Sequence, residues 1–310
     1  MRRLTDQPIA VIGLGLMGRP IAHNLLAAGA ALTVWNRSPE PLAELVAAGA
    51  TAADSPSQLG AQLAGHTIIL ALWDGAAIRS TIGHKEGLLD ELGPGSLMID
   101  MGTTDLKTTH WLHSAADSHA AACLDAPVSG GQQGARNATL SIMAGGSPEH
   151  FARALPILEC LGNKVTHCGG PGSGQVTKLA NQIIVAQTVA AVAEALHFAK
   201  AAGVDPATVR SALSGGFADS KILELHGQRM LSGDFTPGGR SSGQLKDIQL
   251  AHDLATELMI ELPGLATNTQ VWQSMVDAGH ADQDHSAIYQ YLQSLAPPQE
   301  LGRSPDGAAS

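Results

Sequence analysis

The sequence predicts an α/β domain with a doubly wound, mostly parallel sheet, followed by an all-α domain. Two observations support this expectation. Short apolar runs alternate with helical patterns up to about residue 168, and a long apolar stretch at 175–202 follows a glycine-rich break at 169–174. Alternating strands and helices are typical of parallel sheets. A helix that is apolar on every face is buried on every face, so we expect a long buried helix to join the two domains.

Short apolar runs mark the strands of this sheet. The clearest runs lie at residues 9–12, 32–35, 67–72 and 96–100, with weaker candidates at 121–124, 139–144 and 164–167. Helical patterns between them include residues 20–28, 40–48, 104–119 and 148–161. The chain of 310 residues is long enough for two domains. We expect these domains at 1–170 and 171–296, followed by a loose tail at 297–310.

A glycine-rich turn follows the first strand directly. It consists of Gly13, Leu14, Gly15, Leu16, Met17 and Gly18, and a helix and a second apolar strand come next. A strand, a G-x-G-x-x-G turn, a helix and a strand form the dinucleotide-binding fingerprint of a Rossmann domain. The first glycine permits the tight turn, the second lets backbone approach a pyrophosphate, and the third lets the helix pack closely. The helix N-terminus then offers free N–H groups to the phosphates.

The end of the second strand indicates which dinucleotide the turn accepts. NAD sites usually carry an acidic residue about 20 positions after the glycines, where it bonds the ribose 2′-hydroxyl. This chain has Asn36, Arg37 and Ser38 there, so no carboxylate repels a 2′-phosphate. Arg37 can bind that phosphate, and Asn36 and Ser38 can donate to it. We therefore expect NADP(H) to be preferred over NAD(H), with an ordinary surface arginine as the alternative.

The composition argues against several classes of function. The chain has 18 Lys and Arg against 28 Asp and Glu, a net charge of −10 and no basic run, which disfavours a nucleic-acid partner. We expect no membrane span and no signal segment. Three cysteines without metal-binding spacing fit a reducing compartment, so we expect a cytoplasmic protein. Closely spaced His and Asp residues at 280–285 are more typical of a solvated loop than of a metal site, and we expect no metal.

A serine and two glycines follow the strand-like run at 121–124. Ser129 supplies a hydroxyl group, and Gly130 and Gly131 expose backbone N–H groups that no side chain shields. Such a loop can hold a substrate carboxylate. On local sequence alone, an ordinary Pro/Gly turn is the alternative.

Lys178 and Asn181 stand near the start of the long apolar helix. They are three residues apart and therefore share a helix face. A lysine beside a carbonyl oxygen can donate the proton that accompanies hydride delivery, and Asn181 can bond the same oxygen. The alternative is a surface lysine whose stem lies along apolar neighbours. Lys246 is a further candidate for contact with cofactor or substrate, and a surface Lys246–Asp247 pair is its alternative.

Together these segments resemble the β-hydroxyacid dehydrogenases, the family of 3-hydroxyisobutyrate dehydrogenase. Four blocks occur in the family's order within about residues 8–295, and they are residues 13–20, 125–131, 174–181 and 246–247. Four blocks in order are far more specific than any one of them. The resemblance implies a Rossmann domain joined by a long helix to an all-helical domain, assembled as a homodimer or homotetramer through that helix.

The resemblance also implies an activity and the residues on its substrate side. It implies an NADPH-dependent reductase of a small carboxylate-bearing aldehyde, or a dehydrogenase of the corresponding hydroxyacid. Lys178 matches the family's general acid/base, and Asn181 matches its substrate-orienting asparagine. Ser129, Gly130 and Gly131 match its substrate-binding loop.

On the cofactor side, three more residues enter through the resemblance. Thr103 matches a Ser-Thr element near the nicotinamide, Lys246 matches a lysine near cofactor and substrate, and Leu72 completes the expected cofactor-binding residues. The stretches at 124–146 and 178–184 look most like members of the family that reduce tartronate semialdehyde to glycerate. That reduction is therefore the expected reaction.

The chain departs from the family pattern at Leu106, where proline is frequent, and at Ala138, where glycine commonly precedes Thr139. A Gly- and Ser-rich run at 239–243 can change the rim of the substrate cleft, so the identity of the substrate stays open. The alternatives within the family act on 3-hydroxyisobutyrate, glyoxylate or succinic semialdehyde. A 6-phosphogluconate dehydrogenase-like enzyme usually has His-Asn after its lysine, whereas imine reductases and non-catalytic relatives usually lack that lysine. Lys178 therefore argues against the last two.

Overall fold

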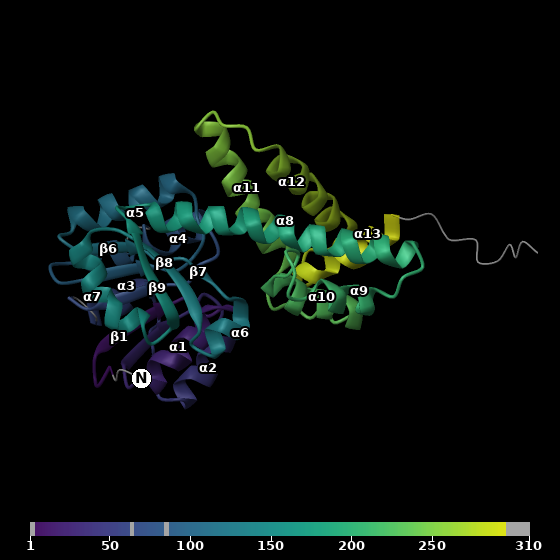
Figure 1. Cartoon of the computed structure of the whole chain (residues 1–310). Helices are drawn as coiled ribbons and strands as arrows, with labels where there is room; N and C mark the ends of the chain where they lie inside the picture. Colours follow the sequence, from purple (N-terminus) through teal and green to yellow (C-terminus); the bar gives the residue numbers. More distant parts are fainter. Residues whose placement is uncertain (1–3, 63–64, 84–86, 296–310) are drawn as a thin grey trace, which may run out of the picture. The chain divides into compact units, whose positions relative to one another are not determined.

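The computed structural model describes residues 4–62, 65–83 and 87–295. The tail expected at 297–310 lies outside the described residues. The chain divides into two compact units. Unit 1 runs to Ile184 and also contains Lys246–Leu265, whereas unit 2 consists of Val185–Leu245 and the chain from Ala266. The α/β fold followed by a helical region is confirmed (Figure 1).

One sheet forms the centre of unit 1. The strands in the described residues are β1 (Pro8–Ile12), β2 (Ala31–Trp35), β3 (Thr51–Ala52), β4 (Thr67–Leu70), β5 (Leu97–Asp100), β6 (Ala122–Asp125), β7 (Val128–Ser129), β8 (Leu140–Gly145) and β9 (Gly162–Gly169). They pair in the order β3-β2-β1-β4-β5-β6-β8-β7, with β9 beside β8. All pairs from β3 to β6 are parallel, whereas β8 runs antiparallel to β6 and β7. The short strands β3 and β7 were not expected from the sequence.

Helices cover both faces of this sheet. Those that come before residue 170 are α1 (Gly18–Ala27), α2 (Glu40–Ala47), α3 (Pro56–Gln62), α4 (Gly75–Ile82), α5 (Leu106–Ser118), α6 (Gly131–Arg136), α7 (Pro148–Leu158) and the 3₁₀ turn η1 (Leu88–Glu91). On β1, Ile9 and Val11 pack in one hydrophobic cluster with α1, α2 and α7, whereas Ala10 and Ile12 pack in another with α3, α4 and α5. Successive strand residues alternate between faces, and burial on both sides explains why β1, β4 and β5 consist mostly of apolar residues.

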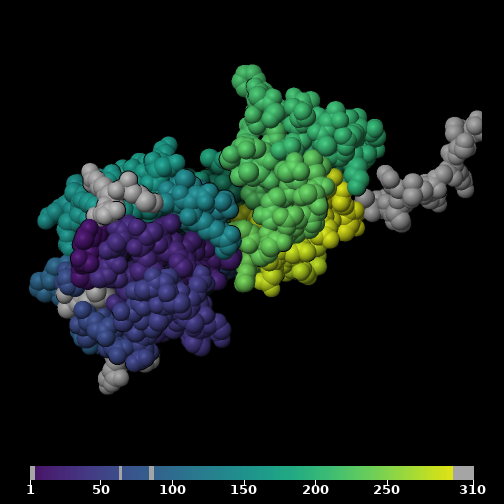
Figure 2. Space-filling view, turned by 90° about the horizontal axis from the view of Figure 1, so that it is seen from below, coloured from purple at the N-terminus to yellow at the C-terminus, as the bar shows by residue number. Residues whose placement is uncertain are grey.

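The topology places the candidate segments at one edge of the sheet. The carboxyl ends of parallel strands lie at the same edge, so the loops after β1, β2, β4, β5 and β6 gather there. Here α1 and α6 lie side by side although more than a hundred residues separate them (Figure 1). Figure 2 shows purple residues of the N-terminal part of the chain against teal residues that come later in the sequence. Nδ2 of Asn24 on α1 donates to the carbonyl oxygen of Ala135 on α6, at 2.6 Å.

The long helix α8 (Ser173–Ala201) begins in unit 1 and continues into unit 2. Ala186, Val189 and Leu196 are fully buried within unit 2, whereas Phe198 is 75% exposed. By length and composition α8 is also apolar enough to cross a membrane, a test that core helices of soluble proteins pass as well, and 44% of its most apolar stretch is buried. The expected helix at 175–202 is thus found within two residues at its start and one at its end.

Helices form the rest of the described chain. They are α9 (Pro206–Leu213), α10 (Lys221–Ser232), α11 (Ser241–Glu257), α12 (Pro263–Met275), α13 (Ile288–Leu295), the π-helical turn η2 (Val276–His280) and the 3₁₀ turn η3 (His285–Ala287). As expected, Asp205 caps α9, because its side chain accepts hydrogen bonds from the N–H groups of Ala207 and Thr208. Pro206 occupies the first helical position, where its missing N–H costs nothing.

A buried carboxylate organises unit 2. Asp284 is 1% exposed and accepts hydrogen bonds from Nη1 of Arg229 (2.9 Å) and from the N–H groups of Gly238 (3.0 Å) and Ser286 (3.1 Å). Burial raises the pKa of Asp284, but hydrogen bonds from His226 and Ser286 outweigh it and hold that pKa well below its usual range. In the described residues, no three His, Cys, Asp or Glu side chains form a metal-binding group.

Candidate active site

The glycine turn, residues 13–18, connects β1 to α1 and is shaped by its glycines. Gly13 has a φ of +94°, and a Cβ atom there would lie 2.5 Å from the carbonyl oxygen of Ala71. A Cβ atom on Gly18 would lie 1.8 Å from the carbonyl oxygen of Gly13, so α1 can begin here only with glycine. Gly15 is exposed, and no described atom lies within 4 Å of the position that its Cβ would take. The turn therefore leaves space at its middle glycine for the pyrophosphate of a dinucleotide.

The N-terminus of α1 has no cap from a side chain. Met17 is the N-cap residue, and the first turn carries no acidic side chain. A helix N-terminus of this kind attracts phosphate groups through its N–H groups and its dipole. Behind the turn, the N–H of Leu14 donates to Oδ1 of Asn36 (2.9 Å), and Nδ2 of Asn36 donates to the carbonyl oxygen of Ser38 (2.8 Å). Asn36 therefore holds the glycine turn against the end of β2, a role that the sequence did not indicate.

Two residues after β2 face solvent. Arg37 and Ser38 are both exposed, and no carboxylate follows the strand before Glu40. An exposed guanidinium at this position is accessible to a 2′-phosphate. Leu72, which follows β4, is half-buried, and its carbonyl oxygen lies 2.7 Å from the position of a Cβ on Gly102. The loops after β4 and β5 are therefore tightly apposed.

Residues 102–104 form a turn after β5 that contains Thr103, the residue expected near the nicotinamide, and we call it the nicotinamide turn for that expectation. It begins beside Asp100, which is fully buried and whose Oδ1 accepts a hydrogen bond from the N–H of Gly102 (3.0 Å). Oδ2 of Asp100 has no partner among the described residues. Burial raises the pKa of Asp100 to about 7, and Asp125 adds to the rise. A buried carboxyl group thus lies directly beneath this turn.

The loop of Ser129, Gly130 and Gly131 spans the end of β7 and the start of α6. Ser129 pairs with Ser141 of β8 and is half-buried. Gly130 and Gly131 have φ values of +132° and +59°, a backbone region that favours glycine, and both are exposed. The structure thus presents their backbone with no side chains, as the proposed cradle for a carboxylate requires.

Asp125 connects the end of β6 to the start of α8. It is 1% exposed, and its two carboxylate oxygens accept hydrogen bonds from the N–H groups of Gly172 and Gln175, each at 2.9 Å. Nε2 of His113 lies 3.2 Å from Oδ1 of the same carboxylate. Asp125 therefore attaches the first turn of α8 to the end of β6. Ser129 follows Asp125 by only four residues.

Lys178 lies one turn further along α8 and is 7% exposed. Its Nζ donates to Oε1 of Gln182 (2.9 Å), and Nδ2 of Asn181 donates to the same oxygen (2.8 Å). Nε2 of Gln182 donates to Oδ2 of Asp247 (2.6 Å). Burial lowers the pKa of Lys178 to about 8, against the attraction of Asp247. At neutral pH this ammonium group is mostly protonated yet close to losing its proton, as a proton donor in catalysis requires.

Lys246, on α11, reaches the nicotinamide turn. Its Nζ donates to the carbonyl oxygen of Thr103 (2.7 Å) and lies 2.8 Å from Oδ1 of Asp247. The side chains of Lys246 and Asp247 are 19% and 12% exposed, so this pair is not the solvent-exposed pair considered as an alternative. The ring of Trp73 lies 5.6 Å from the Lys246 ammonium. We refer to Lys178, Asn181, Gln182, Lys246 and Asp247 as the lysine network.

Of the predicted residues, Lys246 on α11 contacts the nicotinamide turn directly. Lys178 and Asn181 on α8 are connected to it through Gln182, Asp247 and Lys246. No described contact links them to Ser129–Gly131 or to Arg37, which reach the same sheet edge through β7 and β2. Gln182 was not predicted as a site residue, although it stands four residues after Lys178 and therefore on the same helix face. Gln175 and the two strand-end carboxylates Asp100 and Asp125 were not predicted either.

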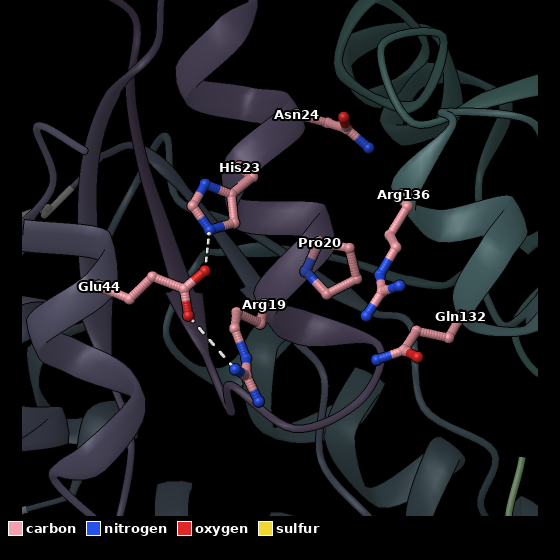
Figure 3. A pocket seen from close by; sticks show the side chains of 7 residues that line it. All are labelled: Arg19, Pro20, His23, Asn24, Glu44, Gln132 and Arg136. Carbon is pink, nitrogen blue, oxygen red and sulfur yellow. Dashed lines mark hydrogen bonds and ion pairs between the residues drawn. The ribbon is translucent and has the colours of Figure 1, made fainter. Parts of the chain in front are cut away.

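A groove of about 220 Å³ opens elsewhere on unit 1 (Figure 3). It is lined by Arg19, Pro20, His23, Asn24, Glu44, Gln132 and Arg136. Glu44 on α2 accepts hydrogen bonds from His23 (2.8 Å) and Arg19 (3.3 Å) of α1, and these hydrogen bonds lower the pKa of Glu44. None of the seven residues belongs to the predicted site.

Two sequence models of protein families match the chain. Residues 8–170 match the NAD binding domain of 6-phosphogluconate dehydrogenase. Residues 172–292 match the NAD-binding domain of NADP-dependent 3-hydroxyisobutyrate dehydrogenase. The two matches together cover both the glycine turn and the lysine network.

Curated proteins and solved structures are similar over almost the whole chain. The chain is 40% identical to a 2-hydroxy-3-oxopropionate reductase of Escherichia coli over 288 residues, which are 93% of this chain and 98% of that protein. It is 32% identical to a mitochondrial 3-hydroxyisobutyrate dehydrogenase of Mus musculus, covering 94% of this chain and 88% of that one. A 3-hydroxyisobutyrate dehydrogenase of Mycobacterium tuberculosis, solved with L-serine, has a TM-score of 0.83 at 30% identity, covering 93% of this chain and 100% of that one.

Proposed function

Because the chain belongs to the β-hydroxyacid dehydrogenase family of NAD(P)-binding oxidoreductases, we propose that it reduces tartronate semialdehyde to glycerate with NADPH. The observation that carries this proposal is the buried ammonium group of Lys178, whose network reaches the nicotinamide turn through Asp247 and Lys246. The choice of substrate is supported by the 40% identity to a reductase of 2-hydroxy-3-oxopropionate, which is tartronate semialdehyde.

The glycine turn and its neighbours would hold the coenzyme. The open space at Gly15 and the uncapped N-terminus of α1 fit a pyrophosphate. Arg37 and Ser38, exposed after β2, would bind the 2′-phosphate, and Leu72, Thr103 and Lys246 would line the nicotinamide end. A bound NADPH supplies a hydride to the aldehyde carbon.

The preference for NADPH over NADH is part of the proposal. It is supported by Arg37 and by the absence of an acidic residue from the segment after β2. A structural neighbour with a TM-score of 0.84 and 25% identity, covering 92% of this chain and 99% of that one, was solved with NADP⁺.

Lys178 would supply the proton. Reduction of an aldehyde adds a hydride to carbon and a proton to oxygen, so charge develops on the oxygen as the hydride arrives. Nζ of Lys178 carries three N–H groups, of which one is directed to Gln182. Another is available to donate to the substrate oxygen, which Asn181 would help to orient. Loss of the proton leaves a neutral amine, a form that burial favours.

The loop of Ser129, Gly130 and Gly131 would hold the substrate carboxylate. Its hydroxyl and backbone N–H groups are donors without a charged side chain. Fixing one end of a three-carbon substrate presents its aldehyde end in a restricted set of positions, and such positioning accounts for much of an enzyme's rate enhancement. In this proposal residues 1–170 carry the coenzyme and residues 171–296 contribute Lys178, Asn181 and Lys246.

The proposal includes a cytoplasmic homodimer or homotetramer assembled through α8. In unit 2, Phe198 is 75% exposed and Phe217 is fully exposed, an unusual state for side chains of this size. In this proposal a second copy of the chain covers exposed apolar side chains of this kind. Light scattering after size-exclusion chromatography tests it: a Phe198→Glu variant should lower the measured mass, and a monomeric unmodified protein would contradict this part of the proposal.

The decisive experiment is a spectrophotometric assay with purified protein. NADPH or NADH is mixed with tartronate semialdehyde, glyoxylate, succinic semialdehyde, methylmalonate semialdehyde or a cyclic imine, and loss of the reduced nicotinamide absorbance is followed. We expect the highest kcat/KM with tartronate semialdehyde and NADPH. A higher value with methylmalonate semialdehyde would favour a 3-hydroxyisobutyrate dehydrogenase. Turnover of the imine alone, or of nothing, would reject the proposal.

A further inference from the structure

Gln175 has no part in the proposed hydride and proton transfer, but its side chain lies between α8 and the nicotinamide turn. It is fully buried in the first turn of α8. Its side-chain amide makes two hydrogen bonds to the nicotinamide turn: Oε1 accepts from the N–H of Thr104 (3.2 Å), and Nε2 donates to the carbonyl oxygen of Gly102 (2.9 Å). Its own backbone N–H is bound by Asp125. Gln175 is therefore fixed on one side to the sheet and on the other to the turn.

The amide spans the whole turn. Gln175 bonds the first and last residues, Gly102 and Thr104, and Lys246 bonds the carbonyl oxygen of the residue between them, Thr103. Side chains from α8 and α11 thus satisfy backbone groups that a surface loop would leave to water. Leaving such a backbone group without a partner away from water is unfavourable, so these hydrogen bonds hold the turn in one conformation.

Through α8, the hydrogen bonds of Gln175 to the nicotinamide turn also restrict the position of Lys178, the proposed proton donor. Gln175 and Lys178 are three residues apart and share one face of α8. A helix is stiff over a single turn, so the position of the Gln175 amide fixes the position of Lys178 relative to Thr103. No hydrogen bond joins Lys178 to the turn directly in the described structure, and the alternative connection runs through three side chains, those of Gln182, Asp247 and Lys246.

We propose that Gln175 is a positioning residue, whose amide fixes the nicotinamide turn against the first turns of α8 and so sets the geometry between Thr103 and Lys178. This inference rests on the proposed function, because it assigns the hydride side of the reaction to the turn and the proton side to Lys178. Misplacement of reacting groups by about 1 Å can reduce a rate about 100-fold.

The first test needs no coenzyme. In Gln175→Met, a side chain of similar length lacks both hydrogen-bonding groups, so the amide of Thr104 loses its acceptor. Hydrogen exchange of the apo protein should show faster exchange at residues 102–104 than in the unmodified protein, with α1 and β1 unchanged. Gln62→Met, at an exposed position on α3, is the matched control. Unchanged exchange at residues 102–104 would show that the Gln175 amide does not hold the turn. This result would overturn the positioning role of Gln175 whatever activity the protein proved to have.

The second test measures catalysis. We expect kcat of Gln175→Met to fall about 10- to 100-fold, while KM for the aldehyde changes by less than about threefold. The deuterium isotope effect with NADPH labelled at the transferred hydrogen should increase, because hydride transfer becomes slower than product release. A loss confined to KM, or an unchanged isotope effect, would contradict a positioning role.

The third test compares one variant with the unmodified protein at several pH values, so that a folding difference that does not depend on pH leaves the trend unchanged. In Gln175→Glu, the protonated carboxyl group can donate to Gly102 and accept from Thr104 as the amide does, whereas the ionised carboxylate repels the carbonyl oxygen. Burial should raise the pKa of the introduced group into the measurable range. The ratio of kcat in the variant to kcat in the unmodified protein should therefore rise as the pH falls. A ratio that does not vary with pH would overturn the proposal.

Discussion

The glycine turn and the lysine network lie at the same edge of one sheet but are built in opposite ways. The glycine turn consists of backbone, with an open middle glycine and a helix N-terminus that no side chain caps. The lysine network consists of side chains that are mostly buried and hydrogen-bonded to one another. Its members come from α8 and α11, which are far apart in the chain.

This difference separates binding from chemistry. Backbone N–H groups and a helix dipole cannot ionise in the physiological range, so the glycine turn offers the same surface to phosphates at any ordinary pH. A buried lysine exists in two protonation states, and its surroundings decide which is populated. We therefore expect substitutions in the glycine turn to change coenzyme affinity, and those in the lysine network to change the rate of the chemical step.

The largest expected effect comes from breaking the network. Lys178→Ala removes the proton donor, and kcat for aldehyde reduction should fall about 10²–10⁴-fold, the usual contribution of a general acid. The dissociation constant of NADPH, measured by its fluorescence, should change less than threefold, because the glycine turn is untouched. The control is Lys107→Ala, at a lysine that is 76% exposed on α5. An intact kcat would remove Lys178 from the mechanism.

The next effect comes from filling the glycine turn. A Cβ on Gly15 meets no described atom, so Gly15→Ala should leave the melting temperature within about 2 °C of the unmodified protein. The added methyl group occupies space that we assign to the pyrophosphate, and the dissociation constant of NADPH should rise at least tenfold, about 1.4 kcal/mol. Gly93→Ala, also in open space, is the control. Unaltered NADPH binding in Gly15→Ala would place the coenzyme elsewhere.

A third substitution sharpens the description of the coenzyme side. Arg37→Ala should raise KM for NADPH about tenfold, because charged hydrogen bonds contribute about 1.5–3 kcal/mol, and should leave KM for NADH unchanged. The ratio of KM for NADPH to KM for NADH should therefore rise about tenfold, and this ratio is the quantity to compare between the variant and the unmodified protein. Equal effects on both coenzymes would contradict binding of the 2′-phosphate by Arg37.

The two regions also differ in how far the sequence could predict them. The glycine turn is contiguous, and steric limits on the backbone require glycine at positions 13 and 18, so its residues could be named from spacing alone. Lys178 and Lys246 were also named, but Gln182, which accepts a hydrogen bond from Lys178, was not, because a glutamine in an apolar helix has no distinctive pattern. Gln175 bonds a turn more than seventy residues away, and only tertiary structure reveals such a contact.

The same limit applies to the sheet. Strands β1, β2, β4 and β5 were predicted because continuous apolar runs are typical of strands buried on both faces. The strands β3 and β7 contain two residues each and carry no periodicity to detect. The role of Asn36 was only partly predicted: its position after β2 suggested a contact with the coenzyme, whereas its amide bonds the glycine turn and Ser38.

The smallest expected effect concerns Ala138, a residue outside both regions at which the chain departs from the family pattern. Ala138, where the family commonly has glycine, has a φ of +53°, a conformation that strains a residue with a Cβ. Ala138→Gly should relieve this strain, partly offset by the entropy of glycine in the unfolded chain, and raise the free energy of unfolding by about 0.5–1 kcal/mol. Denaturant titration measures it, and a lower stability would contradict this interpretation.

The central claim is that Lys178 donates the proton, and the pH dependence of kcat for aldehyde reduction tests it most directly. Burial lowers the pKa of Lys178 to about 8, so the donor is protonated below that pH and lost above it. In the unmodified protein, kcat should be level at low pH and fall about tenfold per unit as the pH rises beyond about 8. Lys178→Ala should show a low kcat without this decline. The same decline in both proteins would contradict the claim.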